Sequence, residues 1–328
     1  MSWFRGSVFS VKGMWQFTKG GFERARANFH DEEMTVACDN RVFIITGANS
    51  GIGRAIAEEL VRRGGNVHIV CRNPDKCAET GRHLRQLNGS AQVTEHVVNM
   101  SEMSAILEFT ERFKKVIGKL DVLINNAGVL LDEQINSKEK FDVSFATNSL
   151  GPYVLTRELL PLLEQSADAR VITMSSGGMY NEKLDLEDIQ SINKGFNGTR
   201  AYAQQKRQEV IMMEQFALKH PKVLFTSMHP GWVDTPGVER SLPTFYQMMK
   251  NKLRKPAEGA DTAIWLSTVP RSHSGIVNGG FYFDRQSVSK HLPLAWTHSA
   301  PEEDAQLMTM LADFTMQALR TKGITEAT

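Results

Sequence analysis

A short apolar run that ends in a glycine-rich turn constrains the fold of this chain more than any other feature. The stretch "RVFIITGANSGIGRAIAEELVRRGG" at 41–65 joins a strand-like run to an amphipathic helical run. Taken alone, a loose glycine triplet is equally typical of a structural turn. Between a strand and a helix, however, it lets a phosphate approach the backbone at the helix N-terminus. We therefore expect Gly47, Gly51 and Gly53 to form a phosphate-binding turn.

The same alternation of strand-like and helical runs continues to about residue 290. Helical stretches are expected at about 138–166, 200–219 and 256–268, and apolar runs between them include "NVHIVCR", "ARVITMSS" and "KVLFTSMHPG". Parallel strands that are buried on both faces and joined by helices have this pattern. We predict one α/β domain over residues 39–290, with a single Rossmann-type, doubly wound parallel sheet and helices on both faces.

Residues 1–38 have the pattern of a basic amphipathic N-terminal extension. The first acidic residue is Glu23, and apolar residues recur at near-helical spacing: Trp3, Phe4, Val8, Val11, Trp15 and Phe22. Arg5, Lys12, Lys19, Arg24 and Arg26 lie between or after them. Three interpretations stay open, namely a helix packed on the domain, peripheral contact of residues 1–30 with a membrane or lipid surface, and a mitochondrial presequence.

Residues 291–328 form a C-terminal extension in the prediction. One helical stripe of this extension is apolar, and it consists of Leu307, Met310, Leu311, Phe314 and Leu319. Such a stripe is more typical of a helix docked on the core than of a partner site.

Composition excludes some function classes. The chain has 328 residues, of which 41% are hydrophobic, and a net charge of +1, so we expect no nucleic-acid partner. Three cysteines in a chain of this length favour a reducing, intracellular compartment over a disulfide framework. The location is then cytoplasmic or peripheral on a membrane, with a mitochondrial location as the other interpretation. Cys71 and Cys77 are expected to be inert packing residues.

The end of the second strand bears on the choice of cofactor. An acidic residue there would bind the ribose hydroxyls of NAD, but this chain has Cys71, Arg72 and Asn73. A guanidinium matches a 2′-phosphate in charge and geometry, so Arg72 favours NADP(H) over NAD(H). The alternative is that Arg72 is a solvated residue at a strand end. His229 stands before Pro230 without a second ligand at metal-like spacing, so we expect no metal site.

Several motifs occur in a characteristic order: "TGANSGIG", "NNAG" at 125–128, Asn148, "SS" at 175–176, "YAQQK" at 202–206 and "HPG" at 229–231. With these motifs the chain resembles the short-chain dehydrogenase/reductase family over roughly residues 40–290.

The resemblance implies catalytic roles for four residues. Tyr202 is the expected catalytic acid/base with Lys206 as its partner, Ser176 holds the substrate oxygen, and Asn148 completes a water-linked proton relay. Lys206 stands four residues after Tyr202, on the same side of a helix, where its positive charge favours the phenolate. A hydrogen bond from Ser176 would stabilise the developing oxyanion.

The resemblance also implies a cofactor site. Gly47, Asn49, Ser50, Gly51, Ile52 and Gly53 make the dinucleotide turn, and Asn126, Ala127 and Gly128 line the adenosine side. Pro230, Gly231, Val233 and Thr235 run along the nicotinamide, and Tyr202 and Lys206 also contact the cofactor. The family usually has Asp near the end of the third strand, where this chain has Asn99. The amide oxygen of Asn99 is expected to accept from the adenine amine.

The resulting hypothesis is an NADP(H)-dependent oxidoreductase that acts on a small apolar carbonyl or alcohol, such as a retinoid, a steroid or a lipid-derived aldehyde. The substrate class rests on the resemblance and on Met-rich segments such as "FYQMMKNKL" at 245–253. The alternative is a catalytically weak dinucleotide-binding scaffold or lipid-surface adaptor. The resemblance also implies a homodimer through the helices near 138–165 and 200–219.

Overall fold

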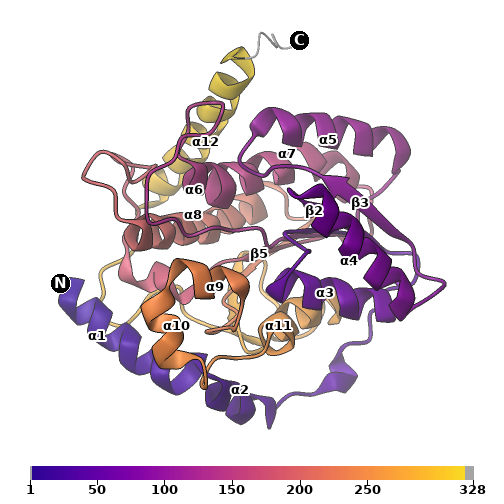
Figure 1. The fold of residues 1–328 in the computed structure, drawn as a ribbon, viewed down its shortest axis with the longest axis horizontal. Coiled ribbons are helices and arrows are strands. Elements are labelled where there is room, and N and C mark those ends of the chain that lie inside the picture. The colour runs from indigo at the N-terminus through magenta and orange to yellow at the C-terminus, as the bar shows by residue number, and fades with distance from the viewer. Residues whose placement is uncertain (1, 322–328) are drawn as a thin grey trace.

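An eight-stranded sheet forms the centre of the computed structural model, which describes residues 2–321 (Figure 1). The strand order is β3-β2-β1-β4-β5-β6-β7-β8, and every neighbouring pair is parallel except β7 and β8. The strands are β1 (Val42–Thr46), β2 (Asn66–Cys71), β3 (Val93–Val97), β4 (Val122–Asn125), β5 (Arg170–Met174), β6 (Leu224–Met228), β7 (Gly280–Phe283) and β8 (Gln286–Ser287). The chain builds outward from β1 to β3 and then crosses to β4, which confirms the predicted doubly wound sheet.

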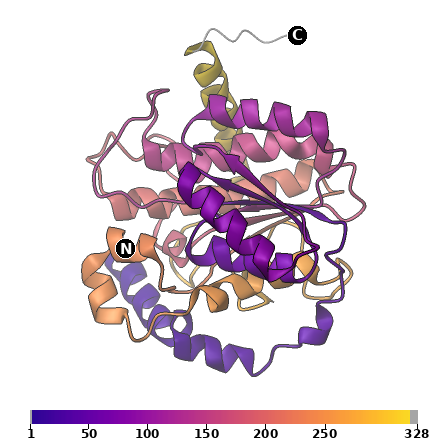
Figure 2. The ribbon, with the colours of Figure 1, turned by 45° about the vertical axis from the view of Figure 1, so that its right-hand side comes forward.

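Helices cover both faces of this sheet, as predicted (Figures 1 and 2). Helices α5 (Met103–Val116), α7 (Gly151–Leu163), α8 (Gly198–Lys219) and α12 (Pro301–Thr321) share one apolar cluster. Helices α3 (Gly51–Arg62), α4 (Pro74–Leu87) and α11 (Pro256–Thr268) share the cluster on the other face. Alternate residues of β1 enter the two clusters, with Ile44 in the first and Phe43 and Ile45 in the second.

The remaining elements are short or lie near the chain ends. They are α1 (Ser2–Lys12), η1 (Gly13–Phe17), α2 (Lys19–Arg26), η2 (Asp31–Glu33), α6 (Val143–Phe145), η3 (Ala146–Leu150), η4 (Gly177–Asn181), α9 (Pro236–Ser241) and α10 (Pro243–Met249). Elements η1 and η3 are π-helical.

The helix predicted over 138–166 begins later than expected. Residues before Asp142 form a loop, in which Lys140 has a φ of 65°. The Asp142 carboxylate then accepts hydrogen bonds from the N–H groups of Ser144 and Phe145 and so caps α6. The helical path continues through η3 into α7 and ends at Leu163.

The N-terminal segment packs on the body of the protein. Phe17 and Phe22 are 1% and 4% exposed, and Arg5 Nε donates to the Ala295 carbonyl at 2.6 Å. This packing agrees with the first of the three interpretations of residues 1–30. Val11 and Trp15 are exposed, although the pattern placed them on the same stripe as Phe22. The side chains of Trp3 and Phe4, also on that stripe, lie outside the described ones.

Helix α12 docks on the first core cluster. Leu307 and Leu311 are fully buried there, and Met310 and Phe314 pack against the cluster. The C-terminal end of α12 projects from the body in both ribbon views (Figures 1 and 2).

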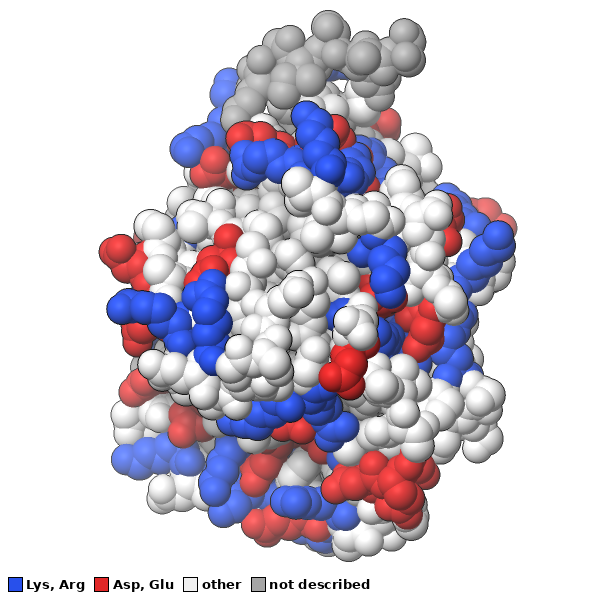
Figure 3. Space-filling model, turned by 90° about the vertical axis from the view of Figure 1, so that its right-hand side faces the viewer, with Lys and Arg blue, Asp and Glu red and all other residues white. Residues whose placement is uncertain are grey.

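Acidic and basic side chains are interspersed on the face drawn in Figure 3. Among the described residues 2–321, no helix is both long and apolar enough to cross a membrane.

Candidate active site

A cavity of about 1200 Å³ lies at the carboxyl ends of the parallel strands, around the point between β1 and β4 where the strand order reverses. This is where ligands bind in open α/β sheets. All but one of the predicted site residues line it: Gly47, Asn49, Ser50, Gly51, Ile52, Gly53, Arg72, Asn99, Asn126, Ala127, Gly128, Ser176, Tyr202, Lys206, Pro230, Gly231, Val233 and Thr235. The exception is Asn148, which is fully buried behind the wall.

The glycine turn between β1 and α3 is built for close approach of the backbone. Gly47 has a φ of +67°, and a Cβ there would lie 2.9 Å from Ala127 Cα. A Cβ on Gly53 would lie 2.6 Å from the Gly47 carbonyl oxygen, so only glycine lets the helix start this close to the strand. The first N–H groups of α3 therefore face the cavity, which fits the pyrophosphate of a dinucleotide.

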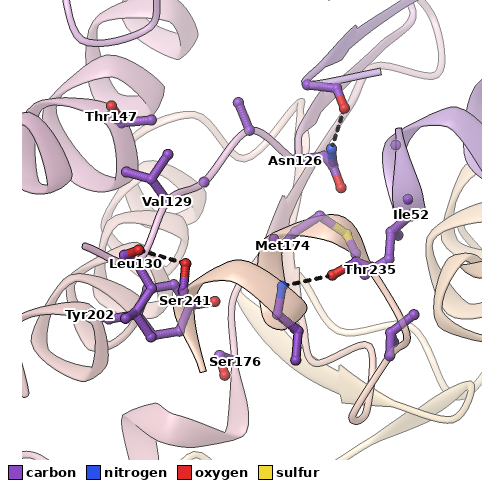
Figure 4. A pocket seen from close by; sticks show the side chains of 18 of the residues that line it. Ile52, Asn126, Val129, Leu130, Thr147, Met174, Ser176, Tyr202, Thr235 and Ser241 are labelled. Carbon is purple, nitrogen blue, oxygen red and sulfur yellow. Dashed lines mark hydrogen bonds between the residues drawn. The ribbon is translucent and has the colours of Figure 1, made fainter. Parts of the chain in front are cut away.

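Asn126 fixes this turn from the next strand of the sheet. Its Nδ2 donates to the Gly47 carbonyl oxygen at 3.3 Å (Figure 4). The same Nδ2 donates to the Thr46 carbonyl oxygen at 2.8 Å, and the backbone N–H of Asn126 donates to Thr46 Oγ1 at 3.0 Å. Asn126 thus ties the end of β4 to the end of β1.

Arg72 and Asn99 lie at the carboxyl ends of β2 and β3. The Arg72 side chain is exposed and forms no hydrogen bond or ion pair with the described residues, so its guanidinium can meet an anion. Asn99 is engaged locally: its Oδ1 accepts from Ser101 N at 3.2 Å and from Ser101 Oγ at 3.0 Å. The Asn99 oxygen predicted to meet adenine therefore already accepts two hydrogen bonds.

Ser176 and Tyr202 face the cavity from η4 and α8. Figure 4 shows both side chains at the end of the cavity away from Ile52 and Asn126. Ser176 Oγ accepts from Gly178 N at 3.2 Å, which leaves its O–H proton to donate into the cavity. The neighbouring Ser175 is 2% exposed and donates to the Lys206 carbonyl at 2.8 Å, so its proton is already used.

Lys206 lies one turn after Tyr202 and is buried. Its Nζ is 5.4 Å from the centroid of the Tyr202 ring, and it donates to the Met174 carbonyl at 2.8 Å. A second hydrogen bond runs from Nζ to Glu209 Oε1 at 2.7 Å. Burial lowers the pKa of Lys206, but the charges of Glu209 and Tyr202 outweigh burial, so this pKa is raised above its ordinary value.

Asn148 lies within the π-helical turn η3. Its Nδ2 donates to the Val129 carbonyl at 2.7 Å and to Gln205 Oε1 at 2.6 Å, and its Oδ1 accepts from Val129 N at 2.8 Å. Asn148 therefore links α8 to the segment that follows "NNAG" and supports the cavity wall from behind.

His229 makes a local structural contact beside the cavity. Its Nδ1 accepts from Gly177 N at 2.9 Å, which fixes the start of η4 beside Ser176. Burial, together with the charges of Arg254 and Lys12, lowers the pKa of His229 well below its ordinary value, so the ring is neutral.

The cavity also has apolar walls that no motif predicted. Phe9 of α1, Trp232, Leu242 and Phe245 line it, and the Trp232 and Phe245 rings meet edge to face with centroids 5.1 Å apart. Near-helical spacing could have drawn attention to Phe9, but no signal in the sequence brings α1 to this cavity.

Comparisons with known proteins agree with this geometry. The family model for short chain dehydrogenases matches residues 41–186. Dehydrogenase/reductase SDR family member 12 of Homo sapiens is 42% identical over 311 residues, which cover 95% of this chain and 98% of that protein. Retinol dehydrogenase 12 of Bos taurus is 34% identical over 228 residues, covering 68% and 72% of the two chains.

Solved structures show the same fold at lower identity. An alcohol dehydrogenase from Thermococcus sibiricus matches with a TM-score of 0.55 and 23% identity over 71% of this chain and 92% of that chain. Levodione reductase matches with a TM-score of 0.61 and 20% identity over 74% and 95%. The sequence similarity, together with the motifs in one cavity, shows that this chain belongs to the short-chain dehydrogenase/reductase family and is an NAD(P)-dependent oxidoreductase of small carbonyl or alcohol substrates.

Proposed function

We propose that the protein is an NADP(H)-dependent oxidoreductase for an apolar aldehyde or ketone and the corresponding alcohol, with Tyr202 as the general acid/base. The observation that carries the proposal is that Ser176, Tyr202 and Lys206 line the same cavity as the glycine turn. When bound, the nicotinamide supplies or accepts the hydride.

The residues of this chain handle the oxygen and its proton. In reduction, the carbonyl oxygen gains negative charge, and the O–H groups of Ser176 and Tyr202 are placed to donate to it. Tyr202 gives up its proton to this oxygen, and Lys206 stabilises the resulting phenolate by its positive charge. In oxidation, the phenolate takes the proton back. Asn148 holds the wall behind Lys206 and is the proposed end of the proton relay.

The preference for NADP(H) rests on Arg72. This guanidinium lies exposed at the end of β2, Lys76 also lines the cavity nearby, and the expected acidic residue is replaced by Cys71. Two cations here, with no acidic residue at the end of β2, favour a 2′-phosphate over free ribose hydroxyls, although Glu79 of α4 also lines the cavity.

The apolar substrate class rests on the cavity walls. Phe9, Leu130, Trp232, Leu242 and Phe245 line the cavity into which Tyr202 also faces. Such walls bind a retinoid, a steroid or a lipid-derived aldehyde by apolar burial and leave polar contacts to the reacting oxygen. Similarity to proteins named retinol dehydrogenase supports the same class.

The test uses the purified full chain with NADPH and a panel of retinal, steroid ketones and lipid aldehydes. We expect Tyr202→Phe to lower kcat by at least about 10²-fold because general acid catalysis contributes roughly that much. NADPH binding, followed by fluorescence, should stay intact. Tyr246→Phe is the matched control, because Tyr246 lies on α10 and bonds to Asp234 at 3.1 Å. Full activity of Tyr202→Phe would refute the assigned role, and NADPH binding without turnover of any substrate would favour the scaffold alternative.

We further propose that residues 1–30 contact a lipid surface peripherally. Val11 and Trp15 are 73% and 65% exposed on α1 and η1, with the basic residues Lys12, Lys19 and Arg24 close in sequence. Exposed apolar side chains among cations suit an anionic headgroup layer. The substitution Val11→Ser with Trp15→Ser should reduce flotation with anionic vesicles and leave the urea midpoint unchanged. Equal flotation of this variant and the wild type would refute the contact.

A homodimer through α7 and α8 stays a prediction. Helix α12 packs against α8 and covers part of that surface, because Met308 and Leu311 share a cluster with Ile211 and Met212. Any pairing must therefore involve α12 or the uncovered part of α7.

A further inference from the structure

A buried carboxylate lies next to the proposed catalytic lysine. Glu209 follows Lys206 by three residues on α8, and the two side chains are 2% and 3% exposed. Glu209 Oε1 accepts a hydrogen bond from Lys206 Nζ at 2.7 Å, while Oε2 accepts none from the described residues. No motif predicts a role for Glu209.

The surroundings of this pair make its electrostatic coupling strong. Burial raises the pKa of Glu209 to about 7, and the Lys206 charge and hydrogen bond act against that rise. In a water-poor interior, opposite charges in contact interact more strongly than at the surface.

The elements around α8 bring no other charge to the pair. Met174 and Ser175 at the end of β5 bond to Lys206 and are uncharged, and so is Asn148 of η3 near Gly128. Asp142, which caps α6, bonds to Ser144 and Phe145. The titratable groups on the other packed elements act elsewhere. Tyr180 of η4 and Asp304 of α12 interact electrostatically with Arg207. Glu182, which follows η4, accepts a hydrogen bond from Gln204. The Tyr282 hydroxyl of β7 accepts one from Val277 N. Within the described part of the chain, Lys206 is therefore the titratable group that Glu209 acts on directly, and Lys206 in turn interacts with Tyr202.

The hydrogen-bond inventory of Lys206 shows what Glu209 does geometrically. An ammonium has three N–H donors, and two of them are taken by the Met174 carbonyl and Glu209. These two fixed bonds orient the third N–H of Lys206 toward the cavity, near Gly128. A Cβ added to Gly128 would lie 3.5 Å from Lys206 Nζ. Glu209 thus restricts the ammonium to one orientation.

We propose that Glu209 is a positioning residue that orients the Lys206 ammonium and reduces the positive field this ammonium exerts on Tyr202. The inference rests on the proposed role of Tyr202. With Glu209 ionised, the pair carries little net charge, so Tyr202 faces a weaker positive field than an isolated ammonium would exert. Glu209 thereby favours Tyr202 as a proton donor, which is the form that carbonyl reduction requires.

The test compares wild type with Glu209→Gln, which keeps an oxygen acceptor for Lys206 and removes the negative charge. Glu214→Gln is the matched control, because Glu214 lies on the same helix and pairs with Lys290 at the surface. The pH midpoint of kcat for alcohol oxidation should move lower by about one unit in Glu209→Gln, because the Tyr202 charge still favours the protonated Lys206 and no carboxylate then opposes the field of the ammonium. The control should leave the midpoint unchanged. An unmoved midpoint, or a move to higher pH, would overturn the proposal.

A second measurement separates this proposal from the proposed function, because it needs no turnover. Ultraviolet absorbance follows phenolate formation, and subtracting the titration of Tyr202→Phe isolates Tyr202. In the Glu209→Gln background this titration should also move lower by about one unit. If the titration moves but no substrate is turned over, the proposed function fails and the electrostatic role stands. If the wild type is active and the titration does not move, the role of Glu209 alone is refuted.

Discussion

Arg254 joins the N-terminal segment to the body of the protein, and its removal should be among the most damaging single changes in the chain. The side chain is 1% exposed and forms a two-pronged ion pair with Asp284, with N–O distances of 2.6 and 2.9 Å. It also donates to the carbonyls of Gln16 at 2.8 Å and Phe17 at 3.1 Å. The guanidinium lies 4.8 Å from the centroid of the Phe283 ring.

The expected loss of unfolding free energy follows from the Asp284 carboxylate, which Arg254→Met leaves buried without its partner. Removing one partner of a buried ion pair costs about 3–5 kcal/mol, because the other charge stays buried without compensation. Burial already raises the pKa of Asp284, and hydrogen bonding to Arg254 holds it down, so Asp284 in the variant can take up a proton. That proton uptake limits the loss, and we expect about 4 kcal/mol at pH 7.5.

Urea unfolding followed by tryptophan fluorescence measures this loss. Arg63→Met is the matched control, because Arg63 pairs with Glu59 at 2.8 Å with both side chains 32% exposed, and a surface pair contributes about 1 kcal/mol or less. The double substitution Arg254→Met with Asp284→Leu should recover much of the stability, since no charge is then buried alone. A loss no larger than that of the control would show that the buried ion pair does not hold the N-terminal segment in place.

Two further predictions concern the cofactor and acid stability. Arg72→Ala should weaken NADPH binding by about tenfold, because one charge-assisted contact contributes about that much to affinity. NADH binding should stay unchanged in the same fluorescence titrations. An equal loss of affinity for both nucleotides would refute the 2′-phosphate role of Arg72. Burial lowers the pKa of His68 and of His96 to about 4, from an ordinary value of 6.5. Stability present above pH 6.5 should therefore be lost as the pH falls toward 4, by up to about 3 kcal/mol for His68. Urea unfolding at several pH values checks this, and His68→Gln should flatten the dependence; an identical slope would contradict it.

Much of the fold could be predicted because the strands are short, apolar runs. Strand β1 is buried at every position, as expected of a parallel strand covered on both faces, and the glycine turn follows at once. The cavity could be located for the same reason, since the motifs end strands whose carboxyl ends meet at one edge.

Helical faces were harder to predict where the helix departs from 3.6 residues per turn. The π-helical η1 widens the turn before Phe17, so Phe17 becomes buried while Trp15 points outward. A pattern based on regular helical spacing places Trp15 on the buried stripe. The start of α6 was missed for another reason, because Phe141 extends the apolar periodicity into the loop before the Asp142 cap.

The burial of polar residues on α8 could also not be predicted from the sequence pattern. Gln205, Arg207 and Gln208 have polar or charged side chains, yet all three are buried. Their partners come from distant parts of the chain: Gln205 donates to Ser144, Gln208 to the Ile189 carbonyl, and Arg207 to the carbonyls of Met179 and Lys290. No local pattern encodes these contacts, and Glu209 was missed for the same reason.

The N-terminal segment is part of the support of the active site rather than an appendage. The Phe17 ring meets the His229 ring edge to face with centroids 4.3 Å apart, and His229 in turn fixes η4 beside Ser176. Removing residues 1–30 would take away Phe17, uncover the His229 ring and deprive Arg254 of carbonyl acceptors that belong to this segment. Cleavage as a presequence would therefore damage the fold and the site together, so we expect the segment to be retained in the working enzyme. A lipid contact through Val11 and Trp15 would then lie close in sequence to Phe17, which contacts His229 beside Ser176.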